Sequence, residues 1–288
     1  MPEAHAHDIV LFGATGFTGG LTAEYLARNA ANGTRWALAG RNQKKLEALR
    51  DRLAAIDPAC AALPLLRADV TDEAALRDVV ASTRVIITTV GPYLNYGEPL
   101  VAACAKAGTD YVDLTGEPEF VDRMYTSYHA EAVASGARIV HACGFDSIPH
   151  DLGAYFAVKQ LPEGEPLVVR GYVRAGGKLS AGTFHSAITA ASRLRQAGAA
   201  HAARRKAEPK PAGGRRVRSA KAVPHRDSSL GAWVLPMPTI DPQVVKRSAS
   251  ALERYGPDFS YAHFLALKRL PLAVGVVGGL GALVTLAQ

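Results

Sequence analysis

Short apolar runs alternate with longer stretches rich in Ala, Leu and Glu along the first half of the chain. The first run, Asp8 to Phe12, breaks at a glycine and precedes a helical pattern from about Gly20 to Ala30. Five further runs have the length of buried strands: Trp36–Ala39, Leu63–Leu66, Arg84–Val90, Tyr111–Leu114 and Arg138–Ala142. This alternation predicts an α/β fold with a doubly wound parallel sheet.

Three glycines in the spacing G-x-x-G-x-x-G follow the first run. Gly13 allows a sharp turn, Gly16 a close approach of backbone to a pyrophosphate, and Gly19 tight packing of helix against sheet. The amide end of the following helix favours phosphate. The turn therefore predicts a Rossmann-type dinucleotide site with contacts from Gly13, Ala14, Thr15, Gly16, Phe17 and Thr18.

The second run ends in Ala39-Gly40-Arg41-Asn42, where an NAD enzyme usually has an acid that holds the ribose. A guanidinium can instead pair with a 2'-phosphate and stack on adenine. Gly40 and Arg41 therefore favour NADP(H) over NAD(H), although such basic side chains also cap and solvate helices.

Residues after the third and fourth strands complete the expected cofactor site. Asp69 either accepts a hydrogen bond from the adenine amino group or caps a helix. Gly91 and Pro92 leave room for ribose and nicotinamide at the carboxyl edge of the sheet, where such folds bind ligands.

Composition indicates an enzyme-sized core, because 48% of the 288 residues are hydrophobic. The three cysteines have no C-x-x-C spacing, and the start of the chain does not resemble a signal peptide, so we expect a cytoplasmic protein. The nine histidines fall in no zinc-ligand spacing, so we expect no metal.

The net charge of +7 is local. Residues 193–226 hold eleven Lys/Arg against one acid, which predicts a flexible basic excursion. It is either a solvated linker or the mouth for an anionic substrate, such as a thioester on a phosphopantetheine arm. Nucleic acid is disfavoured because no aromatic side chains are interleaved.

An uncharged segment follows Lys268 and Arg269. Residues 270–287 would span roughly 27 Å as a helix, barely a bilayer core. The glycines at 275, 278, 279 and 281 suit close helix packing. Two interpretations stay open: a membrane-associated tail, or a helix that packs against protein following it in longer relatives.

Six motifs in order resemble the saccharopine dehydrogenase-like oxidoreductases, and among them the bacterial trans-acting enoyl reductases. They lie at residues 13–19, 38–41, 90–93, 97–101, 111–117 and 143–151. The resemblance implies an NADP-binding Rossmann domain at 1–150 and a smaller α/β substrate domain at 151–269. It also implies hydride delivery to a double bond of a lipid or polyketide chain carried on a synthase.

The chain departs from this family in two places. A Gly-Asp-Pro-Gly-Tyr type motif of the relatives is missing, which predicts a C-terminally truncated substrate domain. The turn Ser180-Ala181-Gly182-Thr183 replaces one glycine of a Gly-Gly-Thr turn.

Hydride transfer to carbon also needs a proton donor. Tyr93 follows the fourth strand, and Asp146 and His150 follow the sixth; His150 is best suited near neutral pH. Each residue also has a purely structural interpretation. Tyr93 could simply pack in the core, and Asp146 and His150 could be polar residues at the start of the next helix. Asp113 and Glu117 flank the turn after the fifth strand, and they are either further candidates or caps of the next helix.

The sequence thus predicts an NADP-dependent oxidoreductase that reduces an enoyl bond of a small or carrier-bound acyl substrate, with a polyketide synthase as a candidate partner. Two other interpretations are a short-chain-type carbonyl dehydrogenase using Tyr155 and Lys159, and a redox-inactive, NADP-binding, membrane-associated scaffold. The oligomeric state is not predicted.

Overall fold

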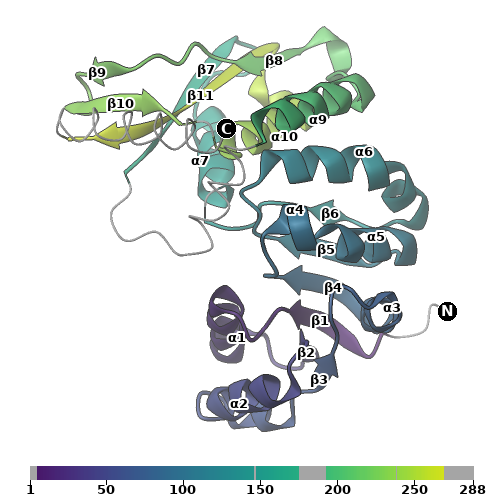
Figure 1. Ribbon diagram of the computed structural model, residues 1–288. Helices are drawn as coiled ribbons and strands as arrows, with labels where there is room; N and C mark the ends of the chain where they lie inside the picture. Colours follow the sequence, from purple (N-terminus) through teal and green to yellow (C-terminus); the bar gives the residue numbers. More distant parts are fainter. Residues whose placement is uncertain (1–4, 146, 175–192, 238, 269–288) are drawn as a thin grey trace. The chain divides into compact units, whose positions relative to one another are not determined.

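The computed structural model describes residues 5–145, 147–174, 193–237 and 239–268. The chain divides into two compact units (Figure 1). Unit 1 comprises Met1–Thr115 and Arg123–Cys143, and unit 2 comprises Gly116–Asp122 and Gly144–Gln288. The chain thus crosses between the two units after Thr115, after Asp122 and after Cys143.

Unit 1 contains a parallel sheet in the order β3-β2-β1-β4-β5-β6. Its strands are β1 (His7–Phe12), β2 (Trp36–Gly40), β3 (Leu65–Arg67), β4 (Thr83–Thr88), β5 (Asp110–Asp113) and β6 (Ile139–Val140). The strand order reverses between β1 and β4, which is where doubly wound sheets bind ligands. The predicted Rossmann-type fold is confirmed.

Helices cover both faces of this sheet, with α1 and α2 on one side and α3 and α5 on the other (Figure 1). They are α1 (Phe17–Asn29), α2 (Gln43–Ala54), η1 (Pro58–Ala62), α3 (Glu73–Ala81), α4 (Tyr93–Tyr96), α5 (Glu98–Ala107) and α6 (Pro118–Ser135). Asn42 caps α2 by accepting from the amide of Lys45, and Asp72 caps α3. Helix α1 begins three residues earlier than predicted, because Gly16 is already its N-cap.

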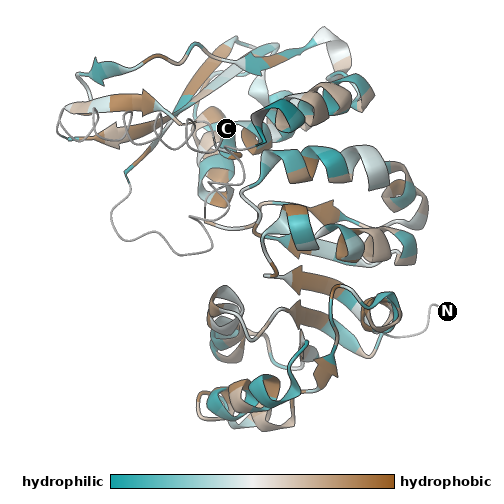
Figure 2. Cartoon of the chain, in the orientation of Figure 1, coloured by the Kyte–Doolittle hydropathy of each residue, from teal (hydrophilic) through white to brown (hydrophobic). Residues whose placement is uncertain are grey.

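Apolar strands form the core of unit 1, as the brown ribbons in Figure 2 show. Leu11 and Leu38 from neighbouring strands pack against Leu46, Leu49 and Leu53, which lie on one face of α2. The i, i+3, i+7 spacing of these leucines therefore places a continuous apolar stripe of α2 on the sheet.

Unit 2 contains a mixed sheet in the order β7-β11-β10-β9, with β8 paired to the first half of β11. Its strands are β7 (Leu167–Val173), β8 (Arg216–Ser219), β9 (His225–Asp227), β10 (Ala232–Pro236) and β11 (Asp258–Leu267). The described helices are α7 (Ile148–Lys159), α9 (Leu194–Ala207), η2 (Ala212–Gly214), α10 (Asp241–Ala251) and η3 (Glu253–Tyr255). Val158 of α7 and Val245 of α10 are fully buried against Phe259 and Tyr261 of β11.

The basic segment 193–226 differs from the flexible excursion that its charge predicts. It forms α9, η2, β8 and the start of β9. Its cations have internal partners: Arg204 pairs with Asp122 at 3.1 Å, and Arg215 donates to the carbonyls of Ala249, Leu252 and Gly256. Arg204 and Arg215 of this segment therefore hold folded structure together.

Several expectations fall on residues that the structure does not describe. The turn at 180–183 and the apolar segment 270–287 lie outside the described residues. In the part of the chain that is described, no helix is long and apolar enough to cross a membrane.

Arg204→Ala should lower the free energy of unfolding by about 2 kcal/mol, since it removes the charge-assisted hydrogen bond to the buried carboxylate of Asp122, which keeps Gln243 and His201 as partners. Urea denaturation followed by circular dichroism measures this change. The exposed neighbour Arg205 is the matched control, and Arg205→Ala should change stability by less than about 0.5 kcal/mol. Equal effects of the two substitutions would contradict an anchoring role for Arg204.

Candidate cofactor and active site

The turn after β1 is held against the neighbouring strands by backbone hydrogen bonds. The amides of Gly13 and Ala14 donate to the carbonyl of Ala39 at 3.0 and 3.2 Å, and the amide of Gly16 donates to Gly13 at 3.0 Å. Gly13 has φ of +82°, in the left-handed region that favours glycine. The turn therefore lies at the carboxyl ends of β1 and β2.

Two glycines of this turn have no space for a side chain. A Cβ on Gly19 would lie 2.2 Å from the carbonyl oxygen of Gly13, and one on Gly13 would lie 2.6 Å from Cγ2 of Val90. The first residues of α1 can pack this closely on the turn only without those atoms. The roles predicted for Gly13 and Gly19 in turning and close packing agree with this geometry.

The N-terminus of α1 opens from this turn without a side-chain cap. Gly16 is the N-cap and offers no side-chain acceptor, while Phe17 is 79% exposed. Uncapped first-turn amides together with the helix dipole favour an anion at this point. The residues present thus fit the pyrophosphate of a dinucleotide.

At the end of β2, the exposed Arg41 lies near enough to Asp69 to influence its charge. Asp69 accepts from the amide of Thr71 at 3.0 Å and from its hydroxyl at 2.9 Å. These hydrogen bonds, with a smaller contribution from Arg41, lower the pKa of Asp69. Asp69 therefore fixes a local turn, whereas the cap of α3 is Asp72.

The end of β4 contributes Thr89, Gly91, Pro92 and Tyr93. The Thr89 hydroxyl donates to the carbonyl of Gly13 at 3.2 Å, which ties β4 to the glycine turn, and the Gly91–Pro92 bond is cis. Tyr93 is buried, and its hydroxyl donates to the carbonyl of Thr88 at 3.1 Å. Of the two interpretations of Tyr93, a proton donor or a packing tyrosine, its burial and this hydrogen bond favour packing.

Sequence reasoning missed the polar network where β5 and β6 end. Asp113 is buried and accepts hydrogen bonds from the Tyr111 hydroxyl and from the amides of Thr115 and Ala142. Its Oδ2 also lies 2.6 Å from Nδ1 of His141. The helix-capping role considered for Asp113 is wrong, because its carboxylate bridges two strand ends.

Strand register could have revealed this network. Tyr111 is aligned with Ile139 and Val112 with Val140, so the next step places Asp113 opposite His141. Ala142, at φ of +60°, is held in the left-handed region by its bond to Asp113. Burial and Asp113 raise the pKa of the adjacent Cys143 to about 11, which keeps that thiol protonated at neutral pH.

A second polar cluster lies in unit 2, around the buried carboxylate of Asp241. We call it the Asp241 cluster; its members are Ser147, His150, Thr239, Asp241, Tyr261 and His263. Oδ1 of Asp241 accepts from the Ser147 hydroxyl at 3.3 Å, and its Oδ2 lies 3.4 Å from Nε2 of His263. Burial lowers the pKa of His263, with Asp241 acting in the opposite direction.

His150 forms the outer side of the Asp241 cluster. Its half-buried ring stands edge-on to that of His263, with 4.5 Å between the centroids. The sequence therefore selected a histidine that is backed by a buried polar network. Asp146, the other candidate on this loop, lies outside the described residues.

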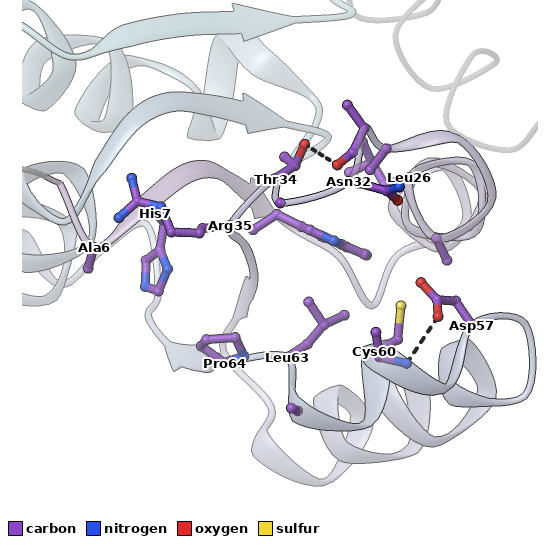
Figure 3. Close-up of a pocket in the computed structure, with 17 residues that line it drawn as sticks. Ala6, His7, Leu26, Asn32, Thr34, Arg35, Asp57, Cys60, Leu63 and Pro64 are labelled. Atoms are coloured by element: carbon purple, nitrogen blue, oxygen red, sulfur yellow. Dashed lines mark hydrogen bonds between the residues drawn. The ribbon is translucent and has the colours of Figure 1, made fainter.

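A separate hollow of about 430 Å³ lies at the opposite, amino-terminal edge of the unit 1 sheet (Figure 3). His7, Trp36 and Pro64 line it where the first three strands begin, and Cys60 faces it from η1. It is thus a different place from the glycine turn. Among the described residues, no group of three or more His, Cys, Asp or Glu side chains could hold a metal ion.

Comparisons with known proteins agree with this geometry. The family described as the saccharopine dehydrogenase NADP binding domain matches residues 9–140. A protein of Mycobacterium tuberculosis (strain ATCC 25618 / H37Rv), whose name assigns it provisionally as a trans-acting enoyl reductase, is 40% identical over 94% of this chain and 68% of its own length. The trans-acting enoyl reductase of Mycobacterium ulcerans (strain Agy99) is 51% identical over 54% of this chain and 36% of its own length.

Among solved structures, apo saccharopine dehydrogenase (L-Glu forming) from Saccharomyces cerevisiae is similar over 58% of this chain and 34% of that chain. The sequence identity is 20% and the TM-score 0.44.

The chain therefore belongs to the saccharopine dehydrogenase-like oxidoreductases, together with relatives named trans-acting enoyl reductases. It is an NAD(P)-dependent oxidoreductase, and its cofactor is NADP(H).

Gly19→Ala should weaken NADPH binding by roughly 100-fold or more, because the added Cβ would force the glycine turn open. Fluorescence titration of NADPH measures the affinity, and circular dichroism checks the fold. Gly20 is the matched control: a Cβ there would meet nothing closer than a guanidinium nitrogen of Arg52 at 3.7 Å. If the Gly19→Ala protein binds NADPH as tightly as the Gly20→Ala protein, the glycine turn is not the pyrophosphate site.

Arg41→Ala should reduce NADPH affinity by roughly 10- to 100-fold and leave NADH affinity unchanged, since only NADPH has the 2'-phosphate. Parallel titrations with both coenzymes measure the preference. Arg28→Ala, which removes an exposed arginine at the other end of α1, should alter neither affinity. An unaltered protein that binds both coenzymes equally would contradict this assignment.

Proposed function

We propose that this protein reduces the carbon–carbon double bond of an α,β-unsaturated acyl thioester at the expense of NADPH. The similarity to relatives named trans-acting enoyl reductases, over 94% of this chain in one case, carries the choice of reaction. The glycine turn of unit 1 supports it, because its shape suits the coenzyme that supplies the electrons.

The predicted cofactor residues keep their roles in this proposal. The turn Gly13–Thr18 would hold the pyrophosphate, Arg41 the 2'-phosphate beside Gly40, and Asp69, Gly91 and Pro92 the adenine and nicotinamide ends. When bound, NADPH supplies a hydride to the β-carbon of the substrate. The protein then has to deliver one proton to the α-carbon.

His150 is the best proton donor among the three predicted catalytic residues. An imidazole can hold and release a proton near neutral pH, and its ring contact with His263 fixes it over the Asp241 cluster. Tyr93 is less suited because its hydroxyl already donates to the Thr88 carbonyl. Loss of a general acid typically costs 10²- to 10⁴-fold in rate.

A short-chain-type carbonyl dehydrogenase is less well supported. That chemistry requires the lysine to lower the pKa of the tyrosine hydroxyl, whereas Lys159 Nζ lies over the Tyr155 ring, 5.7 Å from its centroid. The Tyr155 ring itself stacks on Tyr255. This packing is typical of a tyrosine in a structural role.

We further propose that the acyl substrate arrives on a carrier arm of a polyketide synthase, as the word trans-acting in the relatives' names suggests. Unit 2 offers charge for the phosphate of such an arm. Arg205, Lys206 and Lys210 are exposed in and after α9. Burial lowers the pKa of Lys246, and the nearby positive charges of Arg205 and Arg204 lower it further.

His150→Gln should reduce kcat/KM for NADPH-dependent reduction of a trans-2-enoyl thioester by roughly 100-fold or more, with unchanged NADPH affinity. NADPH oxidation at 340 nm measures the rate. His129→Gln, on the exposed surface of α6, is the control and should keep full activity. Tight NADPH binding without turnover of any enoyl thioester or ketone would instead support a redox-inactive role.

A further inference from the structure

Helix α7 is an unusual surface helix because its polar side chains face inward. The Asp151 carboxylate accepts from the Ser248 hydroxyl in the interior, and His150 packs on His263. Ala154 and Val158 of the same helix are buried against the sheet of unit 2. Asp151 and His150 of α7 therefore face side chains of unit 2.

The outward face of α7 is apolar from Ile148 to Ala157. Phe145, Ile148, Leu152 and Phe156 follow one another at spacings of three, four and four residues, and are 82%, 38%, 58% and 69% exposed. We call these four residues the α7 stripe. Among the described residues from 145 to 157, the other exposed ones are Pro149, Gly153 and Ala157, and Lys159 is the first exposed charge among the described residues of α7.

A helix that is apolar on all sides belongs in an interior, and a continuous exposed apolar face indicates a contact. Helix α1 provides a comparison. It exposes Phe17, Leu21 and Tyr25, but Arg28 and Asn29 share its exposed surface. Helix α7 likewise ends in the exposed Lys159 and Gln160, but its exposed apolar side chains begin before the helix, at Phe145, and continue to Phe156.

We propose that the α7 stripe is the docking site for this chain's own apolar segment, residues 270–287. The segment contains no charged residue and follows Lys268, one residue beyond β11. Two uncharged surfaces in one chain gain free energy by covering each other. Their covalent link gives the contact a high effective concentration.

The side chains of the two surfaces are complementary in size. The α7 stripe presents three bulky aliphatic or aromatic residues spaced four apart, at 148, 152 and 156. The segment has small residues at 275, 278, 279 and 282, which recur at a similar spacing. Large side chains on one surface and small ones on the other allow a close contact. The twelve residues of α7 extend about 18 Å, well within the reach of an eighteen-residue segment.

Disulfide mapping in the full chain tests the proposal. Leu152→Cys is combined with a single cysteine placed in turn at each position from 274 to 283, in a Cys143→Ser background. Val168→Cys is the matched control, because Val168 is also apolar, lies in unit 2 and is 63% exposed. Intramolecular disulfides with Leu152→Cys should form roughly tenfold faster than with Val168→Cys, with maxima every three or four positions.

The same experiment identifies other occupants. Equal rates for Leu152→Cys and Val168→Cys, or no periodicity, would overturn the proposal. Intermolecular disulfides together with a dimeric mass by light scattering would assign the stripe to a second copy. In flotation with vesicles of phosphatidylcholine and phosphatidylglycerol, binding that Leu152→Ser abolishes and Val168→Ser preserves would assign it to a membrane. None of these outcomes depends on the proposed enoyl reductase activity.

Discussion

The structure of unit 1 depends on the contact between Gly19 and the carbonyl of Gly13, where no side chain fits. Any Cβ at Gly19 would fall 2.2 Å from that oxygen, so α1 can start directly on the turn only with glycine there. The same turn receives hydrogen bonds from Thr89 and donates to Ala39. This contact and these hydrogen bonds together fix the ends of β1, β2 and β4 and the N-terminus of α1, which suits a pyrophosphate.

Buried carboxylates organise the remaining polar residues. Asp113 connects β5 to the residues after β6, just before the chain enters unit 2. Asp241 performs a similar task within unit 2, where it joins Ser147 before α7 to His263 of β11. A buried carboxylate is tolerated only when several donors compensate its desolvation. Asp113 and Asp241 therefore each fix the conformation of a loop, which the order of the strands and helices alone does not determine.

The sequence predicted the sheet of unit 1 and the glycine turn because their signals are local: apolar runs, glycine spacing and Arg41 after β2. It failed where partners are distant. The sequence around Arg204 predicts an exposed charge, because its partner Asp122 lies 82 residues earlier in the chain. Asp113 reads as a helix cap until strand register sets it opposite His141. Tyr93 follows a strand end as predicted, but the direction of its hydroxyl depends on the carbonyl of Thr88.

The arrangement of α7 links the candidate chemistry to the surface of unit 2. His150 and Asp151 lie on the inner side of α7. His150 belongs to the Asp241 cluster, and Asp151 accepts a hydrogen bond from Ser248. Residues of the α7 stripe are then left on the outer side, since a helix of this composition has no other polar face to offer water. An exposed apolar face of this kind is typical of a contact surface. The α7 stripe is thus a direct consequence of how His150 is held.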